Sequence, residues 1–292
     1  MSDRITLQSN ELSAEIAFVG AELSSLKDRD GDELLWQGGP EWPRRSPVLF
    51  PIVGRLAGDT LHHAGRPYPM TQHGFARDGE FRLVEEAPTR AVLRLEDDAQ
   101  SRARYPFAFR LDMTYEIEAA TLKVTAEVTN PGSQVLPFGL GAHPGFRWPL
   151  VDGVAKGDHA IEFDGVETGE ALSVRNGLLG PVRRIPLEGH VLPLSEELFA
   201  ADALVLPDVA SRSVRYVARA ADGSVERALL FAWEGYRDLG LWSKPTGAAF
   251  LCIEPWYSMA SPEGWDGEFA EKPGIVHLAP GESRAMTWRV TV

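Results

Sequence analysis

Residues 107–117 read FAFRLDMTYEI, and residues 122–129 read LKVTAEVT. In both segments every second residue is apolar, and most of the residues between them are polar or small. Successive side chains of a β-strand point to opposite faces of its sheet, so this spacing predicts two strands with one buried face each. Only four residues separate the segments, which favours an antiparallel hairpin whose other face is solvated.

The same β-type pattern continues through most of the chain. Residues 81–84 and 91–95 predict a second hairpin, and helical patterns are confined to short segments such as residues 97–105. Glycine and proline turns recur, with no long linker and no internal repeat. The 292 residues therefore predict an all-β protein, built as one large antiparallel β-sandwich domain over residues 1–292. Late strands are expected at residues 228–233, 239–242, 248–254, 274–278 and 286–292.

Composition excludes some classes of partner. The formal net charge is −13, which argues against nucleic acid and anionic membrane surfaces, since both attract basic patches. Cys252 is the single cysteine, so an intrachain disulfide is impossible. The first residues lack the apolar run of a signal peptide, and no segment approaches the length of a membrane span. We therefore expect a cytoplasmic protein.

Two apolar segments end in an ionisable residue followed by proline. Residues 138–146 read FGLGAHPGF, and residues 250–256 read FLCIEPW. Along the first strand His143 shares a face with two glycines, which predicts space for a ligand beside the imidazole. In the second segment Glu254 would be costly to bury without a partner or a purpose. Cys252 is expected on the same face as Glu254, as an unreactive neighbour of the site.

Three further segments contain candidate site residues. Arg55 lies in the apolar segment FPIVGRL, and His73 lies in the loop QHGFARD, which also contains Arg77. Asp202 is the one acidic residue in the apolar segment 198–204. The histidines and acidic residues do not follow the spacing of known metal-ligand motifs, so no metal is expected.

The segments QHGFAR (72–77), GAHP (141–144) and IEPW (253–256) resemble the aldose 1-epimerase (galactose mutarotase) family, in its LacX-like branch. The resemblance extends over nearly the whole chain and implies a β-supersandwich fold. It also implies that the protein interconverts the α and β anomers of a free monosaccharide without metal or organic cofactor.

Transferred by position, the resemblance makes Glu254 the general base and His143 the general acid. His73 would bind near the ring oxygen, Arg55 would hold sugar hydroxyls, and Asp202 is the candidate acidic sugar-binding residue. A carboxylate suits proton removal from the anomeric hydroxyl, and an imidazolium suits protonation of the ring oxygen. Trp242 is expected to offer an apolar face to the sugar.

Two other functions fit the same residues. A non-catalytic carbohydrate-binding β-sandwich would use the arginine, histidines and acid to bind hydroxyls without turnover. An epimerase of hexose 6-phosphates would use Arg55 and Arg77 for the phosphate. We expect a monomer or homodimer.

Overall fold

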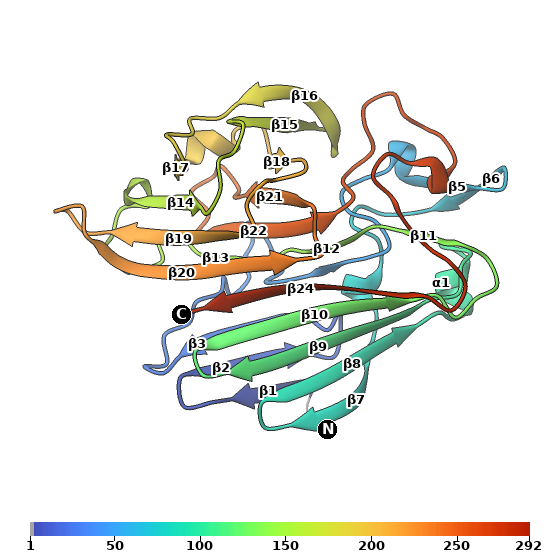
Figure 1. The fold of residues 1–292 in the computed structure, drawn as a ribbon, viewed down its shortest axis with the longest axis horizontal. Helices are drawn as coiled ribbons and strands as arrows, with labels where there is room; N and C mark the ends of the chain where they lie inside the picture. Colours follow the sequence, from blue (N-terminus) through green and yellow to red (C-terminus); the bar gives the residue numbers. More distant parts are fainter. Residues whose placement is uncertain (1–2) are drawn as a thin grey trace.

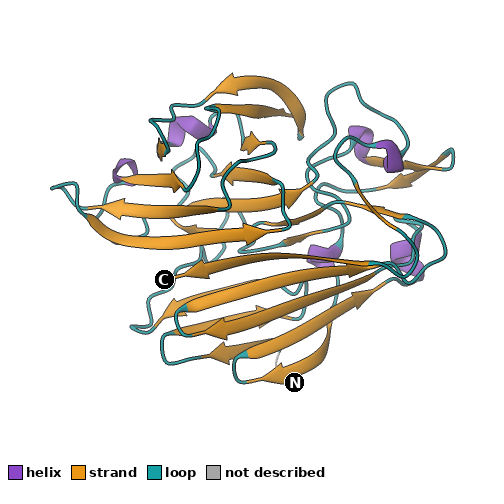
Figure 2. Cartoon of the chain, viewed as in Figure 1, coloured by secondary structure: helices purple, strands orange, loops and turns teal. Residues whose placement is uncertain are grey.

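The computed structural model describes residues 3–292, and strands dominate it (Figure 2). The all-β prediction is confirmed, and every pairing between two named strands is antiparallel. Within the described chain no helix combines the length and apolar character that a membrane span requires. The helices are α1 (Ala99–Arg102) and the 3-10 turns η1 (Ala57–Asp59), η2 (Ala76–Asp78), η3 (Lys156–Asp158), η4 (Glu196–Phe199) and η5 (Phe269–Glu271).

The largest sheet has nine strands and contains both predicted hairpins. Strands β17 and β7 form its two edges. In spatial order the strands are β17 (Val191–Pro193), β14 (His159–Phe163), β19 (Ser213–Arg219), β20 (Val225–Glu234), β24 (Ser283–Thr291), β10 (Thr121–Thr129), β9 (Arg110–Glu118), β8 (Arg90–Glu96) and β7 (Arg82–Ala87).

A second large sheet is built around strand β22. Its strands follow the order β16 (Leu178–Arg184), β15 (Glu170–Arg175), β18 (Leu204–Leu206), β21 (Asp238–Trp242), β22 (Phe250–Tyr257), β12 (Leu140–Ala142) and β4 (Val48–Leu49), and β13 (Gly145–Arg147) also pairs with β22. All five predicted late strands are therefore present, with β23 in a smaller sheet.

Three small sheets complete the fold. They are β1 (Arg4–Gln8), β2 (Leu12–Ala17) and β3 (Leu23–Asp28); β11 (Leu136–Phe138) with β23 (Val276–Leu278); and β5 (Thr60–His63) with β6 (Arg66–Pro69). In Figure 1 strands β7–β10 and β24 form the lower layer, and β15, β16 and β18 lie at the top with β20–β22 between them.

The hairpin of β9 and β10 has the register expected from its sequence. Tyr115 pairs with Val124 and Ile117 pairs with Leu122, and all four side chains are buried. Strand β9 begins at Arg110 rather than at Phe107, although Phe107 and Phe109 are also buried. The backbone N–H of Phe109 donates to the side chain of Asp97 instead of to a neighbouring strand.

The predicted helix at residues 97–105 is shorter in the structure. Only Ala99–Arg102 is α-helical, and Asp98 caps its first turn by accepting a hydrogen bond from the Ser101 N–H. The side chain of Ser101 reciprocates by accepting from the Asp98 N–H. A capping box thus starts the helix, and tertiary structure ends it after one turn.

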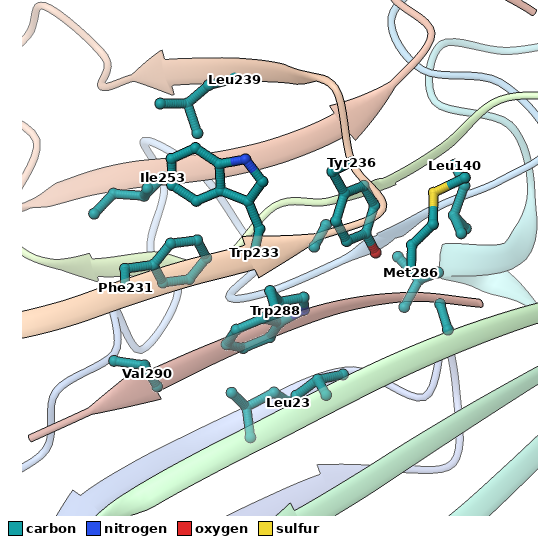
Figure 3. Close-up of a cluster of buried hydrophobic side chains, with 14 of the residues drawn as sticks. Leu23, Leu140, Phe231, Trp233, Tyr236, Leu239, Ile253, Met286, Trp288 and Val290 are labelled. Carbon is teal, nitrogen blue, oxygen red and sulfur yellow. The ribbon is translucent and has the colours of Figure 1, made fainter. Parts of the chain in front are cut away.

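The core fills the space between the two large sheets. Figure 3 shows Phe231 and Trp233 from β20 beside Ile253 from β22, with Trp288 from β24 below them. The rings of Phe231 and Trp288 are stacked with centroids 5.4 Å apart. A single connected cluster of buried hydrophobic side chains runs from Ile5 to Val290.

Strand β22 is buried on both faces. Leu251 and Ile253 belong to the main core, whereas Cys252 and Trp256 belong to two smaller clusters on the opposite face. Because side chains alternate along a strand, the burial of Ile253 directs the Glu254 side chain away from the core. The packing between the sheets thus fixes the direction of the candidate base.

Two adjacent residues on β20 test this core. Phe231 is completely buried and Leu230 is 43% exposed. We expect Phe231→Ala to lower the free energy of unfolding by about 3–5 kcal/mol, because it leaves a cavity between the sheets. The matched Leu230→Ala variant should change it by about 0.5 kcal/mol or less. Urea denaturation of both variants measures the difference, and equal losses would contradict the packing described.

Candidate functional site

A cavity of about 340 Å³ lies against the eight-stranded sheet that contains β22. Five of the six residues predicted from the sequence line it, and Arg55 does not. The five are His73, His143, Asp202, Trp242 and Glu254. These residues come from positions up to 181 apart in the chain, so only the folded topology brings them together.

Glu254 lies in the middle of β22, opposite Gly240 of β21. Its side chain is only 2% exposed. Trp256, two residues further on the same face, also lines the cavity, and a Cβ at Gly240 would come within 2.5 Å of its indole ring. A Cβ at Gly141 on the other neighbouring strand would come within 2.7 Å of the same ring. The indole therefore lies across two neighbouring strands beside the carboxylate.

This packing corrects one prediction. The glycines that precede His143 were expected to leave space for a ligand, but Trp256, Val53 and Leu49 occupy the space at Gly141. Glycine is needed there because an indole ring approaches the backbone closely. The cavity nevertheless borders the imidazole, because both His143 and Trp256 line it.

His143 follows the end of β12, in the bend before Pro144. The Pro144 carbonyl accepts a hydrogen bond from the Ile253 N–H, which joins this bend to β22. Trp42 stacks on the imidazole with ring centroids 4.9 Å apart, and Trp242 meets it edge-on at 5.7 Å. The ring is thus held between aromatic side chains from a loop and from β21.

His143 and Glu254 contact each other directly. Nε2 of His143 lies 3.1 Å from Oε2 of Glu254, and both side chains are more than nine-tenths buried. Nevertheless Glu254 Oε2 and His143 Nδ1 have no hydrogen-bond partner of suitable geometry among residues 3–292. Buried polar atoms in native proteins are nearly always satisfied, so these atoms indicate a site that a polar ligand completes.

Burial shifts both groups toward their neutral forms. Desolvation raises the pKa of Glu254 well above 4.5, and the nearby Asp202 carboxylate adds to this shift. Desolvation also lowers the pKa of His143 from 6.5 to about 3, with Arg77 and Arg44 acting in the same direction. The two groups titrate as a pair, and burial favours the state of the pair with a carboxylic acid beside a neutral imidazole.

His73 lies next to His143, and both side chains line the cavity. Their rings meet edge-on, with centroids 5.6 Å apart. Nδ1 of His73 accepts a hydrogen bond from the Gly54 N–H at 3.1 Å, which leaves the ring proton on Nε2 in the neutral form. Burial lowers the pKa of His73 well below 6.5, and the charges of His143, Arg77 and Arg44 lower it further. Burial therefore favours the neutral form of His73, whose Nε2 lies 3.3 Å from the side-chain amide nitrogen of Gln72.

Asp202 lines the cavity, whereas Arg55 does not. Asp202 has a φ of +69°, and its carboxylate accepts from the Ala203 N–H at 2.8 Å. The Arg55 guanidinium donates to both carboxylate oxygens of Asp59. Its stem packs against Gly177, which lines the cavity, so Arg55 lies beside the site without facing into it. Its role toward a sugar stays a prediction.

The sequence did not single out two residues that line the cavity. Trp42 comes from a loop rich in glycine and proline, where a large aromatic residue has no strand to pack on. Arg77 was considered only for a phosphate, yet its guanidinium lines the cavity and donates to the Gln72 carbonyl at 2.7 Å. Its buried Nε has no hydrogen bond in the described chain but lies 3.9 Å from a carboxylate oxygen of Asp78.

Comparison with known proteins identifies the family. Residues 3–180 match the family model described as aldose 1-epimerase. The protein LacX (plasmid) of Lactococcus lactis subsp. lactis is 30% identical, with 99% of each chain covered. The chain belongs to the aldose 1-epimerase family, as its motifs predicted.

Two solved structures share the fold. A galactose mutarotase related enzyme from Lactobacillus acidophilus has a TM-score of 0.91 and 30% identity, covering 99% of this chain and 96% of its own. A galactose mutarotase-like protein from Lactobacillus casei has a TM-score of 0.90 and 26% identity, covering 99% of both chains. The predicted galactose mutarotase-like β-supersandwich is therefore confirmed.

The buried carboxyl group predicts a pH-dependent effect of Glu254→Gln on stability. The folded pKa lies above the ordinary value, so the stability from Glu254 is complete below about pH 4.5 and is lost as the pH rises through the folded pKa. Glutamine avoids this loss. We expect Tm of the variant to match wild type near pH 4 and to exceed it by about 2 °C or more at pH 8.

The exposed Glu271→Gln variant is the matched control and should shift Tm at neither pH. Thermal unfolding followed by circular dichroism at the two pH values measures both variants. A Glu254→Gln protein less stable than wild type at pH 8 would contradict the inferred burial cost.

Proposed function

We propose that this protein is an aldose 1-epimerase that interconverts the α and β anomers of a free monosaccharide. The observation that carries the proposal is the buried contact of His143 with Glu254 in a cavity of sugar size, where each group keeps an unpartnered polar atom. Membership of the aldose 1-epimerase family supports the same reaction class.

In the proposed mechanism the proton of the pair first moves from Glu254 to His143, whose Nε2 lies 3.1 Å from Oε2 of Glu254. The Glu254 carboxylate then takes the proton from the anomeric hydroxyl, and the His143 imidazolium gives a proton to the ring oxygen. The C1–O5 bond breaks and leaves an open aldehyde. Rotation about C1–C2 followed by the reverse proton transfers closes the ring as the other anomer. Because the pair shares one proton, it enters and leaves the cycle in the same state and needs no proton from solvent.

The other lining residues have supporting roles in this proposal. His73 would donate its Nε2 proton to a sugar oxygen, since Nδ1 is engaged by Gly54. Asp202 would accept from sugar hydroxyls, and the rings of Trp42 and Trp242 would contact the apolar C–H face of the sugar. Desolvation by these rings strengthens the electrostatic contacts of the proton-transfer step.

A hexose 6-phosphate is a second candidate substrate. Arg77 lines the cavity and Arg44 is close enough to influence both histidines, with one carboxylate, Asp78, beside the two guanidinium groups. Such charges attract an anionic substituent. The rotation assay described below therefore uses neutral and phosphorylated aldoses in parallel.

The acid–base pair is tested by Glu254→Gln, His143→Asn and the double variant. Each single change should reduce kcat by about 100-fold or more, because one proton transfer loses its catalyst. The double variant should be little worse than the poorer single variant, since the two groups act as a unit. The measurement is the change in optical rotation of freshly dissolved α-glucose or α-galactose, and of their 6-phosphates.

Circular dichroism first establishes that the three variants are folded. A rate near wild type for Glu254→Gln, or losses that multiply in the double variant, would refute the assigned pair. Sugar binding by the wild type with no acceleration for any sugar would favour the non-catalytic binding protein.

The two arginines are distinguished by their effects on KM. Arg77→Ala should raise KM more than Arg55→Ala, because only the Arg77 guanidinium lines the cavity. Both variants should retain kcat to a greater extent than the acid–base variants, since a lost binding contact acts mainly on KM. Saturation curves for each variant measure this, and a larger KM for Arg55→Ala would return the sugar-binding role to Arg55.

A further inference from the structure

Three ligand-type side chains meet beside the cavity, two of which line it, whereas the fully buried Cys252 lies behind them. They are the imidazole of His143, the thiol of Cys252 and the carboxylate of Glu254, and one ligand atom of each lies within 4.8 Å of the other two. All three residues are buried, and no other such group is found among residues 3–292. The proposed epimerase reaction gives the thiol no task.

Two neighbouring strand segments impose this arrangement. Cys252 and Glu254 are two residues apart on β22 and therefore share a face. Cys252 pairs with Gly145 of β13, and His143 lies in the bend between β12 and β13. The bend therefore places the imidazole next to both ligand atoms of β22.

The spacing is close to that of a metal centre. Zinc bonds of about 2.0–2.3 Å at tetrahedral angles place two ligand atoms about 3.4–3.6 Å apart. His143 Nε2 and Glu254 Oε2 are already 3.1 Å apart, and the widest ligand pair needs to close by about 1 Å. Small rotations of the side chains supply such a movement.

A second observation is independent of the thiol. Glu254 Oε2, on a side chain that is 2% exposed, lies 3.1 Å from His143 Nε2 but has no hydrogen bond of suitable geometry in the described chain. A buried carboxylate oxygen without a donor is a strong site for a cation. The combination of thiolate, imidazole and carboxylate prefers Zn²⁺ over Mg²⁺ or Ca²⁺, which favour all-oxygen sites.

We propose that His143, Cys252 and Glu254 form a binding site for one Zn²⁺ ion, with a fourth position open to the cavity, and that the bound ion inhibits the protein. The binding part stands by itself. The inhibitory part rests on the proposed function, because zinc would occupy both groups of the acid–base pair.

Direct metal binding tests the site in the full-length protein after treatment with a chelator. Wild type should take up one equivalent of Zn²⁺ in competition with a chromophoric chelator. Loss of an outer-shell partner weakens zinc sites by about 10–100-fold, so Cys252→Ser and Cys252→Ala, which remove a ligand, should weaken binding by about 100-fold or more. The control His62→Ala, in a partly exposed pair with Asp266, should bind Zn²⁺ as wild type does.

Cobalt(II) gives a spectroscopic signature of the thiolate. Wild type with one equivalent of Co²⁺ should show a sulfur-to-metal charge-transfer band, and the Cys252 variants should lack it. Wild type without stoichiometric Zn²⁺ binding, or Cys252 variants with wild-type affinity, would overturn the proposal. His143→Asn provides the same binding test from a second ligand if both cysteine variants fail to fold.

An activity measurement separates the two proposals. In chelator the wild type and Cys252→Ser should exchange anomers at similar rates, and one equivalent of Zn²⁺ should inhibit the wild type alone. Inactivity of the wild type in chelator refutes the metal-free epimerase, whereas the binding titration decides the zinc site separately. Equal inhibition of wild type and Cys252→Ser would overturn inhibition through this site.

Discussion

Strand β22 is buried on both of its faces, and the arrangement of the cavity depends on this constraint. Leu251 and Ile253 fill the space between the two large sheets, so Cys252, Glu254 and Trp256 must point to the other side. A shift of one residue in register would exchange the two sets of side chains. The large core therefore holds a carboxylate in a position that it would not adopt by itself.

Burial of these polar groups has an energetic cost that the rest of the fold offsets. Neither Glu254 nor His143 satisfies all its polar atoms within the described chain, and desolvation shifts the pKa of each group toward the neutral form. In the proposed reaction the same burial would strengthen the electrostatic contacts of the pair with a bound sugar.

Much of this architecture could be predicted from the sequence. Alternating apolar residues at 107–117 and 122–129 predicted the central hairpin, and apolar segments ending at His143 and Glu254 singled out two residues that the fold brings into contact. These features depend on periodicity, which is local. The extent of a single domain over residues 1–292 stays a prediction.

Other features depend on contacts between distant segments and were not visible in the sequence. Trp42 stacks on a histidine 101 positions later, and Arg77 rather than Arg55 faces the cavity. The Arg55 guanidinium donates to both carboxylate oxygens of Asp59 beside the site, whereas Arg77 donates to the Gln72 carbonyl at the cavity. Side-chain direction in loops follows from such partners, so composition alone does not determine it.

The indole of Trp256 has a consequence for how sequences of this fold diverge. Its ring covers Gly141 and Gly240, on the two strands that flank β22, at distances that no Cβ atom tolerates. Residues at these three positions are therefore expected to vary together among related sequences. A homologous chain that keeps tryptophan at this place must keep both glycines, and one that acquires a side chain at either glycine must reduce the aromatic ring, so the three columns of an alignment should change together.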